Sequence, residues 1–113
     1  MHELSLCENI LAILQTQAQQ QGFAKVRRIW LEIGELACVE PAALRFSFTA
    51  VAEGSLAEGA TLEIIPVAAR ARCTQCLQET SVQQRFTACP LCGELTLQLI
   101  GGDEMRVKEV EVE

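Results

Sequence analysis

Four of the six cysteines form two Cys-x-x-Cys pairs, separated by twelve residues. Each pair turns the chain tightly enough for both sulfurs to reach one ion, and four thiolates are a common donor set for Zn²⁺ in structural sites. A catalytic zinc site needs an open coordination position, and four protein ligands leave none. The spacing therefore predicts one structural zinc ion held by Cys73, Cys76, Cys89 and Cys92.

Iron is the competing metal, because Cys89-Pro-Leu-Cys92-Gly93 is similar to half of a rubredoxin site. The first pair lacks the matching glycine, since Leu77 follows Cys76, and Phe86 is the one aromatic residue available to cover the sulfurs. An iron protein would be coloured, so visible absorption separates an electron carrier from a zinc protein. A dithiol redox enzyme is a weaker alternative, because two such pairs close in sequence share a metal readily.

His2 is the only histidine of the chain. It can be an exposed residue at a frayed terminus. Alternatively, the α-amine of Met1 and the amide and imidazole nitrogens of His2 can close fused chelate rings around one ion. Ni²⁺ and Cu²⁺ prefer such tetragonal nitrogen sites, whereas Zn²⁺ does not. The amine titrates near ~7.7 and the imidazole near ~6.5, so this site should fill at neutral pH and empty in mild acid.

Two further thiols and two carboxylates could support a metal. Cys7 falls on an apolar helical stripe, which favours a small core residue over a ligand. Cys38 lies in the turn between Gly34 and Glu40, where it could approach a metal or remain a buried thiol. Glu3 and Glu40 are the carboxylates expected to assist.

The composition limits the possible partners. The 113 residues suffice for one small domain plus a metal-stapled module, and the net charge is -6 with a pI near 4.8. An acidic chain argues against binding through phosphate neutralisation, although Arg70, Arg72 and Arg85 leave room for a local basic patch. No apolar run approaches the roughly 20 residues of a membrane span, and no signal peptide is evident. A cytoplasmic protein is expected.

The first 22 residues predict an amphipathic helix whose apolar positions recur at helical spacing. These positions are Leu4, Cys7, Ile10, Leu11, Leu14 and Ala18. Ser5 and Glu8 have capping-box spacing, which places the helix start just after Ser5 and leaves Met1 to Glu3 outside it. Gly22 is the expected stop.

The rest of the chain alternates strands with one more helix. Residues 25–33 alternate as a strand, and Pro41 begins a helix with an apolar seam of Leu44, Phe48 and Val51 that ends near Gly54. Residues 61–69 form a second strand, in which Pro66 indicates an edge or a bulge.

After the cysteines, Leu95, Leu97 and Leu99 alternate as a ribbon strand, and residues 105–112 form a last strand. This last strand should pair with the first two, which makes the cysteine segment an insertion. The predicted fold is a small α/β domain of two helices and a three-stranded sheet with an inserted zinc ribbon. The predicted boundaries are residues 1–68 plus 102–113 for the α/β domain and 69–101 for the four-cysteine zinc ribbon.

Several segments together resemble the HypA/HybF family, which comprises nickel metallochaperones of [NiFe]-hydrogenase maturation. The similarity extends from residue 1 to residue 113. The segments are Met1-His2-Glu3-Leu4-Ser5, Trp30-Leu31-Glu32-Ile33-Gly34, the 54–59 turn with Glu58-Gly59-Ala60, the two cysteine pairs, and Val107-Lys108-Glu109-Val110-Glu111-Val112.

The resemblance implies a Ni²⁺ site built from the amine of Met1, the imidazole and amide of His2, and the amide of Glu3. Some members add a second histidine near the zinc module, and this chain has none, so the remaining ligands stay open. The implied partners are a HypB-type GTPase, the hydrogenase large subunit and, for some members, urease accessory proteins. The chain has no GxxxxGK[ST] phosphate loop, so a carrier rather than an enzyme is expected.

A zinc-ribbon module that binds protein or nucleic acid is the alternative function. The acidic composition and the few aromatic residues count against nucleic acid, because bases would have little to stack on. Nucleic-acid binding that weakens with salt would support this alternative.

Overall fold

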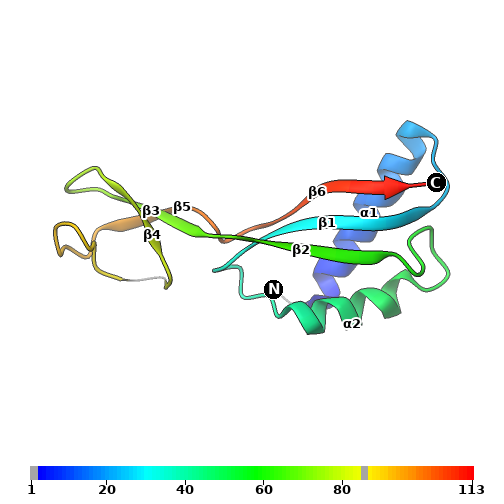
Figure 1. The fold of residues 1–113 in the computed structure, drawn as a ribbon, viewed down its shortest axis with the longest axis horizontal. Helices are drawn as coiled ribbons and strands as arrows, with labels where there is room; N and C mark the ends of the chain where they lie inside the picture. The colour runs from blue at the N-terminus through cyan, green and yellow to red at the C-terminus, as the bar shows by residue number, and fades with distance from the viewer. Residues whose placement is uncertain (1–2, 85–86) are drawn as a thin grey trace. The chain divides into compact units, whose positions relative to one another are not determined.

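The computed structural model describes residues 3–84 and 87–113, arranged as helices and strands in two compact units (Figure 1). Unit 1 comprises Met1–Leu31, Val39–Ile65 and Val107–Glu113. Unit 2 comprises Glu32–Cys38 and Pro66–Arg106. Two helices and two three-stranded sheets make up the fold, in agreement with the predicted fold class.

Helix α1 spans Glu3–Gln21 and ends at Gly22, whose φ of 78° and N–H bond to the Ala18 carbonyl at 2.8 Å form a left-handed cap. The predicted start after Ser5 is wrong, because Glu3 already lies in the first turn, where a carboxylate favours the helix dipole. The buried face is also rotated from the prediction, since Leu4 is exposed and Leu6 is buried. The buried residues are Leu6, Cys7, Ile10 and Leu14.

Helix α2 spans Pro41–Ala52 and begins as predicted at the proline. Glu40 is its N-cap, and its carboxylate accepts the Ala42 N–H at 2.9 Å. Leu44 and Phe48 of the predicted seam are buried, and Ala52 rather than Val51 completes the buried face. The two helices contact each other through Cys7, whose thiol donates to the Leu44 carbonyl at 3.4 Å.

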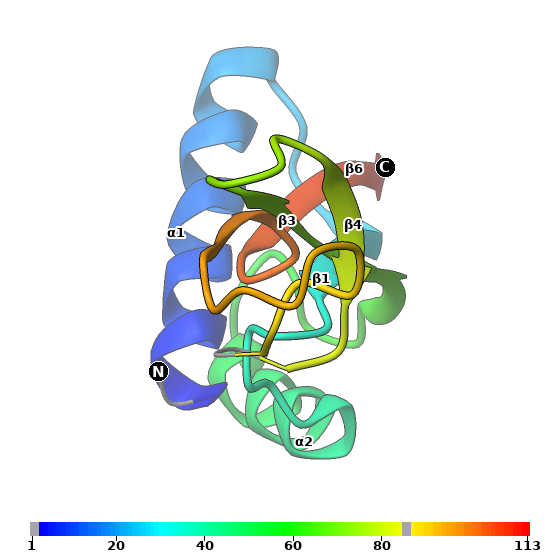
Figure 2. The same ribbon diagram turned by 90° about the vertical axis from the view of Figure 1, so that its left-hand side faces the viewer.

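The first sheet consists of β1 (Val26–Gly34), β2 (Thr61–Val67) and β6 (Met105–Val112) in the order β2-β1-β6. The prediction that the last strand returns to the first two is confirmed. One face of β1 is buried through Ile29, Leu31 and Ile33, and α1 and α2 lie on the same side of these strands (Figure 2). Pro66 lies in edge strand β2, the kind of strand that tolerates proline.

The second sheet belongs to unit 2 and has the order β4-β3-β5. Its strands are β3 (Ala69–Cys73), β4 (Glu79–Val82) and β5 (Leu97–Gly101), all antiparallel. The single predicted strand at residues 61–69 is therefore wrong at its end, because β2 stops at Val67 and β3 starts a different sheet at Ala69. The predicted ribbon strand is confirmed at Leu97 and Leu99 but is wrong at Leu95, because β5 begins at Leu97. Strand β4 was not predicted.

Three backbone segments of unit 2 approach closely at Gly34 and Gly102. A Cβ atom added to Gly34 would lie 2.1 Å from the Gly102 carbonyl carbon. A Cβ atom added to Gly102, which has a φ of 89°, would lie 2.2 Å from the Cα of Ala69. Neither position accepts a side chain without movement of the neighbouring backbone.

The buried thiol of Cys7 should make the folded protein sensitive to alkaline pH. Burial, with the carboxylates of Glu3 and Glu8, raises the pKa of Cys7 from 9.0 to about 11. Between pH 9 and pH 11 the Cys7 thiol therefore stays protonated in the folded state but is deprotonated in the unfolded state. This stabilisation is complete below pH 9 and is lost as the pH rises from 9 to 11, by roughly 3 kcal/mol.

The measurement is the free energy of unfolding between pH 8 and pH 11 for the native chain and for Cys7→Ala. The alanine variant should be less stable at pH 8, because it leaves a small cavity, but it should lose less stability on going to pH 11. All other titrating groups are common to both proteins. Parallel curves for the two proteins would contradict the prediction.

Candidate metal centre

The four paired cysteines of unit 2 converge on one point. Within residues 3–84 and 87–113 they form a group whose Sγ atoms all lie within 4.8 Å of one another. Cys73 Sγ is 3.5 Å from Cys92 Sγ, and Cys76 Sγ is 3.8 Å from Cys89 Sγ. These distances are much longer than the roughly 2.05 Å of a disulfide. The sulfurs therefore form an open cluster of free thiols.

The cluster fits a tetrahedral zinc ion. A Zn–S bond of about 2.3 Å implies sulfur–sulfur distances of about 3.8 Å across a regular tetrahedron. The observed distances of 3.5 Å and 3.8 Å agree with this spacing. When bound, the ion would cross-link four thiolates and so join the two cysteine pairs. The same donor set also accepts iron, so the geometry defines the site without identifying the metal.

The first cysteine pair sits in a tight turn between β3 and β4. The Leu77 N–H donates to the Cys73 carbonyl at 3.0 Å, and the Cys73 N–H donates to the Gln78 carbonyl at 3.0 Å. Leu77 has a φ of 60°, in the left-handed region that costs a residue with a side chain about 1–2 kcal/mol.

The second cysteine pair repeats this turn. The Gly93 N–H donates to the Cys89 carbonyl at 2.8 Å, the Cys89 N–H donates to the Glu94 carbonyl at 2.9 Å, and Gly93 has a φ of 80°. Leu77 thus adopts the conformation that glycine adopts in the second turn. The missing glycine after Cys76, noted in the sequence, does not change the local fold.

Hydrogen bonds stabilise the thiolate of Cys73. The Cys76 amide and then the Thr96 hydroxyl are the main donors that lower the pKa of Cys73 to about 6, against the effect of burial. The Thr96 oxygen lies 3.1 Å from Cys73 Sγ, and the Gln75 amide nitrogen lies 3.4 Å away. These donors therefore make the Cys73 thiol more acidic than an ordinary cysteine.

The thiols of Cys92 and Cys76 hold their protons more firmly. The Glu94 amide lowers the pKa of Cys92, but burial and the neighbouring cysteines outweigh it and raise this pKa to about 12. The Gln78 amide acts in the same way on Cys76, whose pKa is nevertheless raised by burial and by the adjacent thiols.

The predicted nickel ligands are described only in part. Met1 and His2 lie outside the described residues. Glu3 is the first residue of α1 and is half-buried. The N–H groups of a first helical turn have no intrahelical acceptor. The Glu3 amide is therefore free of the helical hydrogen-bond ladder even though the helix starts earlier than predicted.

The remaining candidate groups have other contacts. The Glu40 carboxylate caps α2, and the Cys7 thiol is buried against the Leu44 carbonyl. Cys38 is exposed, has a φ of 58°, and directs its Sγ to the Leu36 carbonyl at 3.8 Å. Arg70 of the suggested basic patch pairs with Glu79 at 3.8 Å, and Arg85 lies outside the described residues.

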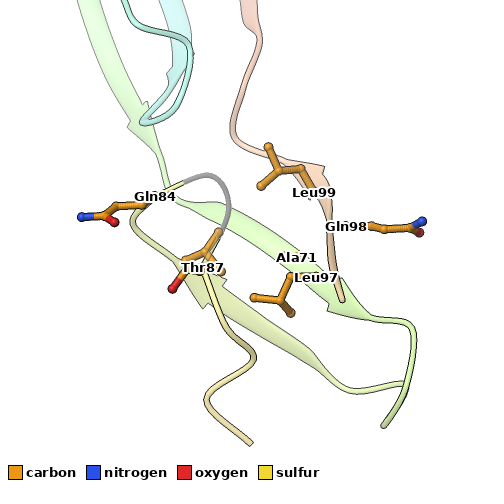
Figure 3. A pocket seen from close by; sticks show the side chains of 7 residues that line it. Ala71, Gln84, Thr87, Leu97, Gln98 and Leu99 are labelled. Carbon is orange, nitrogen blue, oxygen red and sulfur yellow. The ribbon is translucent and has the colours of Figure 1, made fainter. Parts of the chain in front are cut away.

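A hollow of about 330 Å³ lies on the same ribbon (Figure 3). Leu97 and Leu99 of β5 line it together with Ala71 of β3. The polar residues at its edge are Gln84, Thr87 and Gln98, all uncharged. Its described lining thus carries no titratable side chain.

A helix-containing unit joined to a ribbon with four converging thiols defines a small metal-binding protein. A family model described as "Hydrogenase/urease nickel incorporation, metallochaperone, hypA" matches residues 1–112. The chain belongs to the HypA family of nickel metallochaperones.

Curated relatives match over the whole length of both chains. The hydrogenase maturation factor HypA of Acidithiobacillus ferrooxidans is 57% identical over 113 residues, and that of Azotobacter vinelandii is 52% identical, each covering 100% of both chains. The solution structure of the Ni metallochaperone HypA from Helicobacter pylori superimposes with a TM-score of 0.75, covering 99% of this chain and 97% of that chain at 23% identity. A second HypA solution structure gives 0.76, also at 23% identity, and covers 100% of this chain and 97% of that chain. These two structures support the fold.

Sequence reasoning missed Thr96 and the left-handed Leu77. Neither residue type indicates its role, because threonine and leucine are common at many kinds of position.

None of the described helices is long and apolar enough to cross a membrane.

Proposed function

We propose that the protein binds Ni²⁺ at its N-terminus and delivers it for maturation of a [NiFe]-hydrogenase large subunit. The observation that carries this proposal is the nickel-incorporation family model, which matches the chain from its first residue. The proposed ligands are the amine of Met1, the amide and imidazole of His2, and the amide of Glu3. The proposed structural metal is Zn²⁺, held by Cys73, Cys76, Cys89 and Cys92.

The position of Glu3 supports the proposed nickel site. An amide nitrogen binds Ni²⁺ after losing its proton, and an amide inside a helix would lose a hydrogen bond in the process. Glu3 begins α1, so its N–H is not part of the intrahelical ladder. Square-planar nitrogen coordination then leaves the helix intact, and it selects Ni²⁺ over Zn²⁺.

A terminal chelate also suits a carrier. It has no surrounding cage that must unfold, so a recipient can displace one nitrogen at a time. Protonation of the amine or of His2 weakens it, because these groups titrate near ~7.7 and ~6.5. The proposed partners are a HypB-type GTPase and the hydrogenase large subunit, with urease accessory proteins as a second route. The chain acts as a carrier without catalysis, in the cytoplasm, where free thiols persist.

Nickel calorimetry on tag-free, zinc-loaded protein tests the proposal. The native chain should bind about one Ni²⁺ per chain at pH 7.5 and lose most of its affinity at pH 6. His2→Ala, and a chain extended by one residue before Met1, should lose this binding while they keep their zinc. The extension leaves every side chain in place and moves only the amine, so it isolates the terminal chelate.

The result that contradicts the proposal is equal nickel binding by all three proteins. In that case the nickel binds elsewhere, and the extended variant would also be expected to mature hydrogenase normally. Zinc content, measured on the same samples, shows whether the four-cysteine centre is responsible.

A further inference from the structure

The hydrogen-bond donors around the four sulfurs are unevenly distributed. Cys73 Sγ has three donors, namely the amides of Gln75 and Cys76 at 3.4 Å and 3.5 Å and the Thr96 hydroxyl at 3.1 Å. The Gln78 amide contributes to Cys76, and the Glu94 amide contributes to Cys92. Thr96 is the side-chain donor of this set and makes its shortest contact.

Thr96 also connects the two cysteine turns. It lies four residues beyond Cys92, and its hydroxyl reaches back to Cys73 of the first turn. Its carbonyl accepts the Thr74 N–H at 3.0 Å and the Thr74 hydroxyl at 3.3 Å. These contacts hold the Thr96 backbone beside the first turn, and the shorter of them, from the Thr74 N–H, does not depend on the Thr74 side chain.

Four thiolates and one Zn²⁺ carry a net charge of -2, so the sulfurs compete for nearby N–H and O–H groups. A thiolate that accepts several hydrogen bonds is a weaker nucleophile, because its charge is already stabilised. Cys73 is also buried, whereas Cys92 is exposed. The two effects act in the same direction and make Cys73 the most protected sulfur and Cys92 the most accessible one.

We propose that the Thr96 hydroxyl is a positioning group that anchors Cys73 in the metal centre, so that the centre opens at Cys92 first. The inference rests on the proposed zinc occupancy of the four thiols. Attack by an electrophile or by a competing ligand begins at Cys92, and Cys73 is the last sulfur to leave the metal. The uneven distribution of hydrogen-bond donors around the sulfurs thus gives the site a defined order of opening.

Labelling of the zinc-loaded full-length protein with limiting N-ethylmaleimide tests this order. The background is Cys38→Ser, which removes the exposed thiol outside the centre. Peptide mapping should find Cys92 modified first and Cys73 last. Thr96→Val, which keeps the shape of the side chain but removes the hydroxyl, should raise the labelling rate of Cys73 and speed zinc transfer to a chelator roughly tenfold. Thr96→Ser should restore both rates.

The matched control is Thr74→Val, which removes a hydroxyl from the same contact network without removing a donor to sulfur. A second readout uses Co²⁺ in place of zinc. Thr96→Val should shift the sulfur-to-cobalt charge-transfer bands to lower energy, and Thr74→Val should leave them unchanged.

Three results would overturn the inference. They are early labelling of Cys73 in the native chain, equal effects of Thr96→Val and Thr74→Val, and no rescue by serine. A native chain that binds no zinc would instead overturn the metal centre itself, and the zinc content of the starting protein distinguishes this case. If Thr96→Val does not retain metal, the labelling order of the native chain and of Thr96→Ser decides the matter.

Discussion

Cys73→Ser is expected to abolish zinc binding and to unfold the ribbon of unit 2. The apolar cluster under this sheet consists of Ala69, Ala71 and Val82, with a few partly buried leucines around it. Such small side chains bury little surface, so the metal must supply most of the folding energy. Structural zinc contributes about 10–16 kcal/mol of apparent binding energy in small zinc modules, and serine does not replace a thiolate ligand.

Zinc content and amide NMR spectra measure this effect. The variant should contain no zinc, and resonances of β3, β4 and β5 should collapse to unfolded positions. The helices α1 and α2 have their own core of larger residues, including Ile10, Leu14 and Leu44, and should keep their signals. Cys38→Ser is the control, since Cys38 lies outside the cluster, and it should retain one zinc. A folded ribbon in zinc-free Cys73→Ser would refute the prediction.

Gly102→Ala should destabilise the protein by roughly 2–5 kcal/mol. The new Cβ atom would lie 2.2 Å from the Ala69 Cα, and this overlap is with backbone, which cannot rotate away. Crowding of this kind costs about 1–3 kcal/mol. The left-handed φ of 89° adds about 1–2 kcal/mol for a residue with a side chain. Denaturant unfolding followed by circular dichroism measures the loss.

Gly59→Ala separates the two contributions. Gly59 also has a left-handed φ, of 77°, but a Cβ atom there would meet nothing within 4 Å. This control should therefore lose only the conformational part, about 1–2 kcal/mol. Equal losses at Gly59 and Gly102 would show that the close approach to Ala69 relaxes at no cost.

The sequence alone was sufficient to predict the elements that show a regular apolar pattern or that begin or end at a proline or glycine. Pro41 marked the start of α2, Gly22 marked the end of α1, and alternating residues marked β1 and β6. The four-cysteine cluster followed from spacing alone, because two tight turns of the chain bring four sulfurs together.

The parts that failed depend on tertiary contacts. Leu4 and Leu6 are the same residue type two positions apart, and the tertiary packing of α1 leaves Leu4 exposed and Leu6 buried. The break at Ala68 between β2 and β3 was hidden because apolar residues continue across it. The Thr96 contact with Cys73 joins residues 23 positions apart and depends on the register of β5 with β3. No local pattern encodes such a pairing.

The ribbon begins and ends at neighbouring points in space. Arg70 of β3 is the cross-strand partner of Gly101 of β5, and paired Cα atoms lie about 5 Å apart. The two ends of segment 71–100 thus lie as close together as the two strands of a hairpin. Such a segment can be gained or deleted in a gene without moving the flanking residues, and a short turn suffices to close the gap. The segment that carries the metal centre is in this sense a transferable module, which could be grafted into a hairpin of an unrelated protein.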